Sequence, residues 1–364
     1  MNLKTGTISV TSRCVGRIPG AFAAAALLGC RHGLRCLVIH DVSPEESAFT
    51  RGMRLTMTPE ALRTALTFVA ENYTPVSLDD VLTAETGRPL PERAVLVTFD
   101  DGYRSVMDTA VPLCRELGIT PVFFLNAAFI DNHRLAPDNI VCYAVNTVGM
   151  EAVNRAAMAM GAAAAPMKTM TDVFARLFPT LRLQQRNAFL VALKHEAGID
   201  EEKLARDARL YFTRQDLREL AASGLEIGNH TYTHTRCRML SAEDINNEVE
   251  RNKLELEGLT GRPVRSFSIP YGSSADLTTD MRMALKRSGH QAMFLSESVS
   301  NGEADTRLPL DRVSLRSTSS DALFLNIEVL PRLRALRNRH SRRAGTQPRR
   351  TQPVRTGARV DLQS

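Results

Sequence analysis

Two short segments of the sequence carry side chains that could do chemistry together. The first contains Asp100 and Asp101, followed by Gly102, and the second, far along the chain, contains His230 and His234. One carboxylate and two imidazoles form a three-ligand set that leaves an open position on a zinc-like metal. The other carboxylate is then free to act as a base on a water that the metal activates. This combination predicts metal-assisted hydrolysis.

Each segment alone is weak evidence for a catalytic site. An Asp-Asp-Gly sequence after an apolar run is typical of an ordinary turn. Two histidines four residues apart are more informative, because positions i and i+4 share one face of a helical turn. Such pairs also occur on surfaces, so the case for chemistry depends on what surrounds each segment.

Polar residues follow the apolar runs that we expect to form buried strands. The runs end at His40, at Asp100 and Asp101, at Asn126, at Asn229 and His230, and at Pro270 and Tyr271. Segments between them, such as 58–69, 105–117 and 241–256, have the apolar spacing of helices. Strands that alternate with helices indicate a parallel α/β architecture, in which active sites lie at the carboxyl ends of the strands. We therefore predict that these side chains meet at one end of a barrel.

The motifs and their order resemble those of the polysaccharide deacetylases of carbohydrate esterase family four, the group that includes nodulation protein B-like chitooligosaccharide deacetylases. The matching motifs are 98–102, 224–234 and 267–272, and the likeness covers residues 35–130 and 211–316. The resemblance implies an α/β fold, a distorted (β/α) barrel with seven or eight strands. It also implies removal of N-acetyl groups from a sugar in an oligosaccharide, a polysaccharide or a glycolipid precursor.

The resemblance implies a role for each motif residue. Asp100 would be the catalytic base, and the backbone N–H of Tyr271 would help to bind the oxyanion. Asp101, His230 and His234 would hold a divalent metal, for which we expect Zn²⁺. The chain would then be a hydrolase acting on carbon–nitrogen bonds other than peptide bonds.

Three features of the family's pattern differ in this chain. The third motif usually begins with an Arg that orients the base, and Ser268 stands there, so we expect Arg312 to take that role. The fourth motif uses Trp, which the chain lacks, and the fifth supplies a His near the end of the barrel, where none lies. In some relatives the first strand ends in His. We therefore expect His40 to protonate the leaving amine, with His290 or water as the alternative source.

The same departures leave a non-catalytic alternative open. A catalytically weakened barrel that binds glycans without turnover would fit the missing Arg and the aromatic content of 5%. A two-carboxylate glycoside hydrolase fits less well, because that chemistry needs carboxyl groups at least ~5 Å apart across the sugar linkage. It would also leave both histidines unused.

The 364 residues allow one barrel with additions. We predict an N-terminal amphipathic helical segment (1–34), the barrel (35–320) with a helical insertion (131–210), a C-terminal helix (321–340) and a disordered basic tail (341–364). The insertion is rich in Ala and Met, which favours a subdomain that packs on itself with Met as core filler. A lid over the substrate cleft is the functional alternative.

The ends of the chain and its cysteines bear on location. The net charge of +6 is concentrated in the Arg-rich stretch 332–359, which could contact an anionic membrane together with the N-terminal helix. We expect no specific nucleic acid partner, since no binding motif accompanies this stretch. Six cysteines without paired spacing indicate reduced thiols and a cytoplasmic protein, peripheral to a membrane at most. The apolar stretch 21–30, ending in Leu-Leu-Gly-Cys, fits an exported lipoprotein as the alternative.

Overall fold

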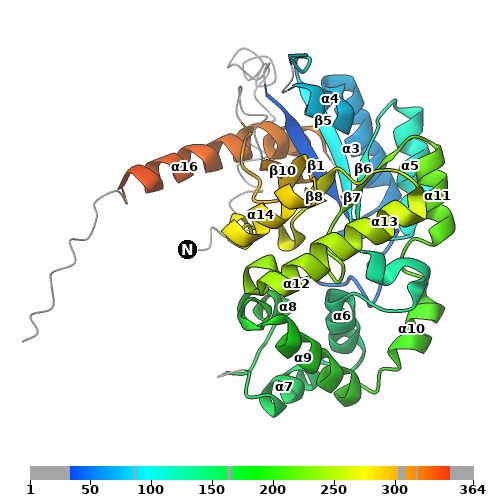
Figure 1. Ribbon diagram of the computed structural model, residues 1–364, viewed down its shortest axis with the longest axis vertical. Helices are drawn as coiled ribbons and strands as arrows, with labels where there is room; N and C mark the ends of the chain where they lie inside the picture. The colour runs from blue at the N-terminus through cyan, green and yellow to red at the C-terminus, as the bar shows by residue number, and fades with distance from the viewer. Residues whose placement is uncertain (1–32, 85–86, 163–164, 302–308, 317–318, 345–364) are drawn as a thin grey trace, which may run out of the picture.

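The computed structural model describes residues 33–84, 87–162, 165–301, 309–316 and 319–344. Figure 1 shows a barrel with a helical lobe beneath it and one long helix that extends from its side. Almost all of the predicted N-terminal segment and most of the predicted basic tail lie outside the described residues. The membrane contacts expected of these two segments therefore stay predictions.

Within the described residues, parallel strands form a closed barrel in chain order. They are β1 (Arg35–Ile39), β5 (Ala94–Asp100), β6 (Val122–Leu125), β7 (Glu226–Asn229), β8 (Ser266–Ser268), β9 (Ala292–Leu295) and β10 (Leu310–Ser314). The ring closes because β1 pairs with both β10 and β5. An additional strand, β4 (Thr74–Pro75), pairs with the start of β5, and β2 (Asp41–Val42) pairs separately with β3 (Thr56–Met57). The predicted barrel of seven or eight strands is confirmed.

Alternation along the strands separates the inside of the barrel from its outside. Every residue of β5 is buried, as expected for a parallel strand covered on both faces. Leu96 packs with Phe124 and Phe294 in a small apolar cluster, whereas Val97 and Phe99 join the larger cluster that includes the surrounding helices. Asp100 shares the face of Leu96, since side chains two and four positions apart point the same way. The base candidate therefore lies above an apolar plug in the barrel.

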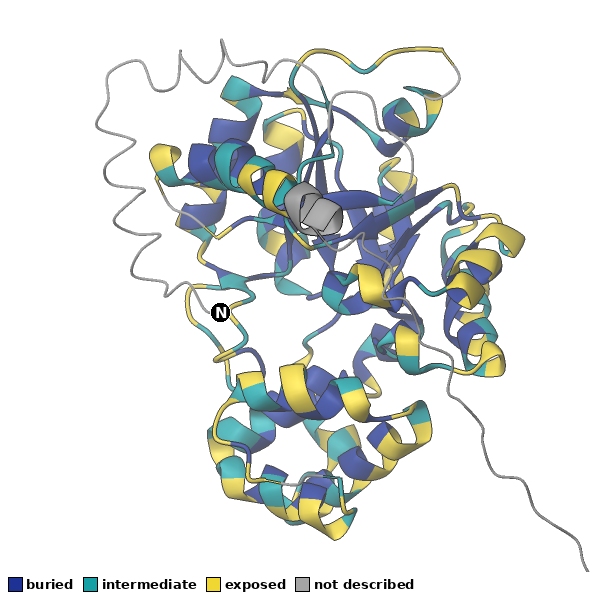
Figure 2. Cartoon of the chain, turned by 90° about the vertical axis from the view of Figure 1, so that its left-hand side faces the viewer, coloured by how far each residue is buried: buried dark blue, intermediate teal, exposed yellow. Residues whose placement is uncertain are grey.

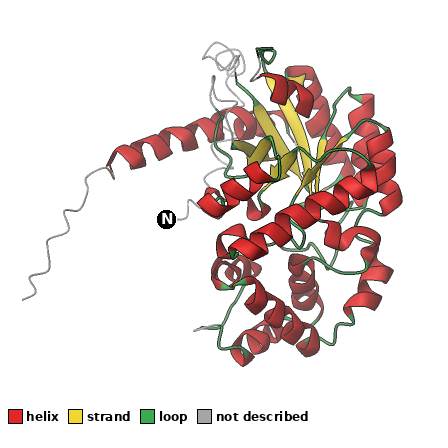
Figure 3. Cartoon of the chain, in the orientation of Figure 1, coloured by secondary structure: helices red, strands yellow, loops and turns green. Residues whose placement is uncertain are grey.

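Helices cover the outside of the barrel (Figure 3). They are α3 (Pro59–Asn72), α4 (Leu78–Ala84), α5 (Ser105–Glu116), α11 (Arg214–Ala222), the run of α12 (Ala242–Asn246), η5 (Asn247–Arg251) and α13 (Asn252–Thr260), and α14 (Thr279–Arg287). Their ends follow the expected chemistry: the Thr58 side chain accepts a hydrogen bond from the Ala61 N–H at the start of α3. Short turns η1 (Ala127–Asn132), η4 (Cys237–Met239), η6 (Pro270–Gly272) and η7 (Ser274–Asp276) lie in the connections.

The C-terminal helical region runs through α15 (Ser320–Phe324), η8 (Leu325–Val329) and α16 (Leu330–Ala344). A buried ion pair of 2.9 Å between Arg35 Nε and Glu328 Oε1 attaches its first part to β1. Among the described residues, none of the helices combines the length and the apolar character that crossing a bilayer requires. The four cysteines in the described ranges are buried and carry free thiols.

The stretch predicted as an insertion forms the helical lobe. It contains α6 (Pro137–Thr147), α7 (Met150–Ala159), α8 (Met170–Asp172), η2 (Val173–Leu177), η3 (Phe178–Thr180), α9 (Leu183–Glu196) and α10 (Glu201–Ala208). Its helices bury apolar faces against one another (Figure 2), with Val153, Phe189 and Leu193 fully buried. The lobe also contacts the loop between β2 and β3, where the rings of Phe49 and Tyr143 stack with centroids 4.9 Å apart.

Candidate active site

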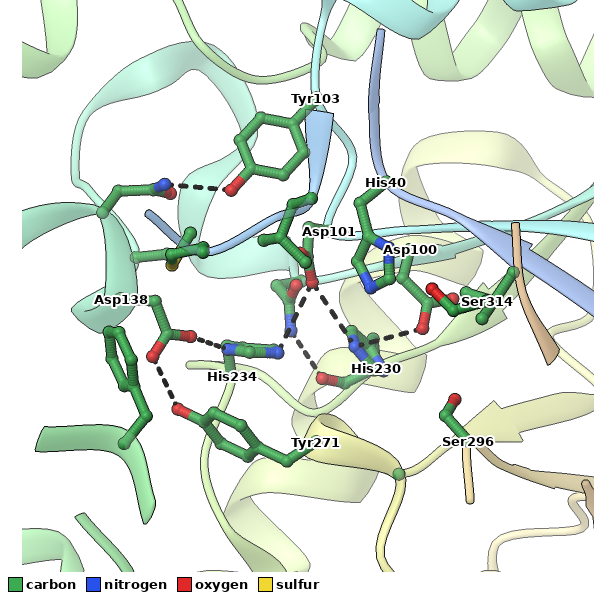
Figure 4. A pocket seen from close by; sticks show the side chains of 18 of the residues that line it. His40, Asp100, Asp101, Tyr103, Asp138, His230, His234, Tyr271, Ser296 and Ser314 are labelled. Carbon is green, nitrogen blue, oxygen red and sulfur yellow. Dashed lines mark hydrogen bonds and ion pairs between the residues drawn. The ribbon is translucent and has the colours of Figure 1, made fainter. Parts of the chain in front are cut away.

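The predicted site residues meet at the carboxyl ends of the barrel strands. All of them line one cavity of about 400 Å³ (Figure 4): His40 after β1, Asp100 and Asp101 at the end of β5, His230 and His234 after β7, and Tyr271 after β8. The closed parallel barrel brings these distant segments together, because its strands all end at the same rim.

The segments that carry Asp101 and the two histidines are irregular loops in which several non-glycine residues have positive φ angles. Residues 230–234 are not helical, so the expectation that the two histidines share a helical face is wrong. Instead Asp101, Thr231 and His234 have positive φ angles of 69°, 62° and 49°, a region that non-glycine residues enter only where the surroundings hold them. The Asn126 side chain provides one such restraint, because its Nδ2 donates to the Thr231 carbonyl at 2.8 Å.

The three predicted ligands converge on one point. The Oδ1 atom of Asp101 lies 3.5 Å from His230 Nε2 and 3.4 Å from His234 Nε2, and one ligand atom from each residue lies within 4.8 Å of the others. This Oδ1 atom is buried and has no hydrogen-bond partner among the described residues. A buried carboxylate oxygen is costly unless something compensates its charge. The donor set therefore fits a divalent metal of the zinc type.

The second ring nitrogen of each histidine is held by a different partner. His230 Nδ1 lies 2.8 Å from the Ser268 carbonyl oxygen, and His234 Nδ1 lies 2.6 Å from Asp138 Oδ2. When Nδ1 donates in this way, Nε2 is left as the ligand atom. Burial lowers the pKa of His234, but the carboxylates of Asp101 and Asp138 outweigh it and raise that pKa to about 9.

Asp100 is bound on both oxygens by Arg312. The two distances, Nη1 to Oδ1 and Nη2 to Oδ2, are 2.7 Å each, and the guanidinium is fully buried. Nη2 also donates to the Ser268 hydroxyl at 2.7 Å. Arg312 therefore contacts both Asp100 and the serine that stands in place of the motif arginine. Burial raises the pKa of Asp100, but the charge and hydrogen bonds of Arg312 together with the nearby imidazole of His230 outweigh burial, and the pKa is lowered. The predicted base is therefore ionised and oriented.

The remaining predicted residues surround this centre. His40 is half-buried in the cavity wall, and burial lowers its pKa despite the nearby carboxylates of Asp101 and Asp100. Tyr271 has a φ of 62°. His290 does not line the cavity: it is buried in the loop between α14 and β9, where Asn229 Nδ2 lies 3.2 Å from its Nε2. Its use as an alternative proton source is therefore not supported.

The insertion forms part of the cavity wall. Met170 and Phe174 line the cavity opposite the barrel strands, and Met53 and Leu55 line it from the loop between β2 and β3. The lobe thus packs on itself and also shapes the cleft, so the expectation that its methionines only fill a core is wrong for Met170.

Sequence reasoning missed Asp138, which contacts His234. It lies in the first turn of α6, where Pro at the preceding position marks a helix start. No motif marks it as part of the site, because only the folding of the insertion brings it to the barrel.

Comparisons with known proteins identify the family of the chain. A family model described as polysaccharide deacetylase matches residues 87–293. The poly-β-1,6-N-acetyl-D-glucosamine N-deacetylase of Escherichia coli (strain K12) is 38% identical over 102 residues, which are 28% of this chain but only 15% of that protein. The chain thus aligns with a small part of its curated relative.

Solved structures show the same fold. The Streptococcus pyogenes deacetylase PplD in complex with acetate aligns with a TM-score of 0.53 at 15% identity, over 82% of this chain and 99% of that one. A de-N-acetylase from Aggregatibacter actinomycetemcomitans aligns with a TM-score of 0.50 at 18% identity, over 79% and 95% of the two chains. At these identities the likeness establishes the fold alone.

Proposed function

The chain belongs to the polysaccharide deacetylase family, and we propose from this premise that it removes N-acetyl groups from glycans with the help of one bound Zn²⁺. Enzymes of this family are hydrolases that act on carbon–nitrogen bonds other than peptide bonds. The observation that carries the proposal is the pairing of two groups in one cavity. Asp101, with its unpartnered oxygen between two imidazoles, lies beside Asp100, which a buried arginine holds ionised.

Asp101, His230 and His234 would hold the metal. When bound, it would supply Lewis-acid activation of the attacking water and of the amide carbonyl, which is a poor electrophile on its own. The side chains around it must still move protons and position the substrate.

Asp100 takes the proton of the attacking water. Its ionised state and its orientation follow from the two hydrogen bonds of Arg312, and His230 Nε2 lies 3.7 Å from its Oδ2. The base therefore faces the same point as the ligands. This arrangement also weakens the alternative of a glycan-binding barrel without turnover, because one of its two grounds, the missing motif arginine, has a replacement in Arg312.

His40 and Tyr271 complete the reaction. The backbone N–H of Tyr271 stabilises the oxygen that becomes negative when water attacks. The imidazole of His40 is neutral at rest because burial lowers its pKa. It takes over the proton that Asp100 removed from the water and donates it to the amine nitrogen as the carbon–nitrogen bond breaks. The leaving group then departs as an amine rather than as an anion.

The substrate we propose is an oligomer or polymer of N-acetylglucosamine. The support is the E. coli relative, which is named for poly-β-1,6-N-acetyl-D-glucosamine, and the cavity itself. A cavity of about 400 Å³ with Phe174 and Tyr271 in its walls offers aromatic faces and polar edges, as ligand sites commonly do. A glycolipid precursor that carries the same sugar is the alternative.

The test is a mass-spectrometric assay on β-1,4- and β-1,6-linked N-acetylglucosamine oligomers incubated with the zinc-loaded protein. We expect one or both series to lose acetyl groups. The Asp100→Asn variant should bind zinc but lose about 10²–10⁴-fold in kcat, because an amide cannot take the water's proton. No acetyl loss from any N-acetylated glycan, or an Asp100→Asn variant that keeps most of its kcat, would contradict the proposal.

A further inference from the structure

One buried carboxylate at the site has no part in the reaction described above. Asp138 is 7% exposed and lines the cavity, yet it comes from α6 of the helical lobe rather than from a barrel strand. Figure 4 shows it between His234 and Tyr271, with one oxygen directed to each. A charged group is rarely buried without a partner, so both contacts matter.

The first oxygen holds a metal ligand. Asp138 Oδ2 lies 2.6 Å from His234 Nδ1, which directs Nε2 of the same ring toward Asp101 Oδ1, 3.4 Å away. His230 is oriented by a neutral carbonyl group instead. A carboxylate accepts a stronger, charge-assisted hydrogen bond and makes the ring a better electron donor. The two imidazoles are therefore held unequally, and the stronger restraint comes from the insertion.

The second oxygen holds the loop after β8. Asp138 Oδ1 accepts a hydrogen bond from the Tyr271 hydroxyl at 2.8 Å. The Tyr271 ring lies between His234, with centroids 5.0 Å apart, and the guanidinium of Arg236, 4.1 Å from the ring centroid. Since the Tyr271 backbone is in the left-handed region, these side-chain contacts help to keep its N–H in place.

Asp138 itself is fixed by the start of α6. A carboxylate in the first turn of a helix is favoured by the helix dipole. The neighbouring Asn139 anchors this turn, because its Nδ2 donates to the Phe49 carbonyl and to the Tyr103 hydroxyl, both at 2.9 Å. The position of the carboxylate is thus set by the packing of the lobe against the barrel.

We propose that Asp138 is a positioning residue through which the helical insertion completes the metal site. One oxygen fixes the ring of His234, and the other fixes the loop that carries the oxyanion donor Tyr271. The insertion is then part of the catalytic centre as well as a wall of the cleft. This inference rests on the proposed metal assignment but not on the identity of the glycan.

The test measures zinc affinity without substrate, by competition with a chromogenic chelator. Asp138→Asn and Asp138→Ala should bind zinc about 10–100-fold more weakly than the parent, with the larger loss for Ala, which cannot hydrogen-bond to His234. Tyr271→Phe removes only the second contact, so it should keep the parent's zinc affinity and lose kcat. Asp216→Asn is the matched control, because it removes a buried carboxylate that caps α11, away from the cavity. Its zinc affinity should equal the parent's.

Each outcome has a distinct meaning, provided that circular dichroism shows a folded protein. Parent-like zinc affinity in Asp138→Ala would overturn the inference and leave Asp138 as a packing residue. If His230→Ala also binds zinc like the parent, the metal assignment itself fails, and with it the proposed function. Weaker zinc binding in the Asp138 variants alone supports the inference, whatever glycan the enzyme uses.

Discussion

At the scale of single residues, the proposed chemistry depends on how the titratable side chains at the barrel mouth are paired. Burial raises the pKa of both Asp100 and Asp101, but Arg312 lowers the first again and the histidines lower the second. Both carboxylates are therefore ionised, although they are adjacent in sequence and Asp100 is buried while Asp101 is partly buried. His40 differs because burial, the largest influence, leaves it neutral. The three environments thus suit three different proposed roles: Asp100 as the base, Asp101 as the metal ligand and His40 as the proton carrier.

The role of His40 can be tested with two leaving groups. We expect His40→Ala to lose about 10²–10⁴-fold in kcat on N-acetylglucosamine oligomers, because the amine cannot leave without a proton. The same variant should lose far less on nitrophenyl acetate, since nitrophenolate leaves as an anion. Stopped-flow and steady-state assays on both substrates, with zinc content checked, would measure this contrast. Equal losses on both would return His40 to a structural role at the end of its strand.

The site residues that could be predicted from the sequence are those that lie in a recognisable sequence motif. The ligands and the base lie in two short strings, and Arg312 could be anticipated because a buried base without its usual arginine needs another cation. Asp138 could not be anticipated. Its role arises from the packing of α6 against the barrel, and a Pro-Asp pair at a helix start is typical of ordinary capping.

At the scale of elements, the packing of neighbouring strands positions the histidine loop. Gly228 in β7 precedes Asn229 and His230, and a Cβ atom there would lie 2.3 Å from the Phe124 ring and 2.8 Å from the Ser266 hydroxyl. The close contact lets the Phe124 ring fill the barrel beneath the site. The strands and their order followed from the sequence, but this contact did not, because register determines which side chains face each other.

Substitution at Gly228 should therefore strain the barrel. We expect Gly228→Ala to lower the free energy of unfolding by about 1–3 kcal/mol, because the added methyl group overpacks the interior. The matched control is Gly258→Ala in α13, where a Cβ meets nothing within 4 Å. That change should raise stability by roughly 0.5–1 kcal/mol, since Ala is the better helix former. Urea unfolding of the metal-free proteins measures both. A stable Gly228→Ala variant would show that the strands can shift.

A buried polar network supports the same strand from the other side. Asn229 contacts His290 Nε2 and accepts a hydrogen bond from Asn252 at 2.7 Å. His290 Nδ1 lies 2.8 Å from the Ser288 hydroxyl. These contacts suit a neutral imidazole, because Nε2 must accept from Asn229. Burial, and then the charge of Lys253, lower the pKa of His290 to about 3.

This network predicts how stability depends on pH. An unfolded chain binds a proton on His290 near pH 6.5, whereas the folded protein resists it until about pH 3. Stability is therefore complete above pH 6.5 and falls as the pH drops toward 3, by up to about 1.4 kcal/mol per pH unit from this group. In metal-free buffer, the stability difference between the parent and His290→Gln should shrink on acidification. A difference that stays constant with pH would refute this assignment.

At the scale of the whole molecule, the barrel and the helical lobe form one functional unit. The barrel supplies the residues proposed as ligands, base and proton carrier, and the lobe supplies Met170, Phe174 and Asp138 to the same cavity. The sequence identified the lobe as a helical insertion from its composition and spacing. It could not show that the lobe reaches the metal ligands, because that depends on the loop after β2 and on the entry angle of α6.

The most direct test of the account is reactivation of the metal-stripped protein with zinc. Deacetylation of an N-acetylglucosamine oligomer should be absent without metal, rise linearly with added zinc, and level off at one equivalent per chain, since Asp101, His230 and His234 form a single site. The His230→Ala variant, treated in the same way, should stay inactive at one equivalent. Full activity in the stripped parent protein, or the same zinc response in His230→Ala, would contradict the account.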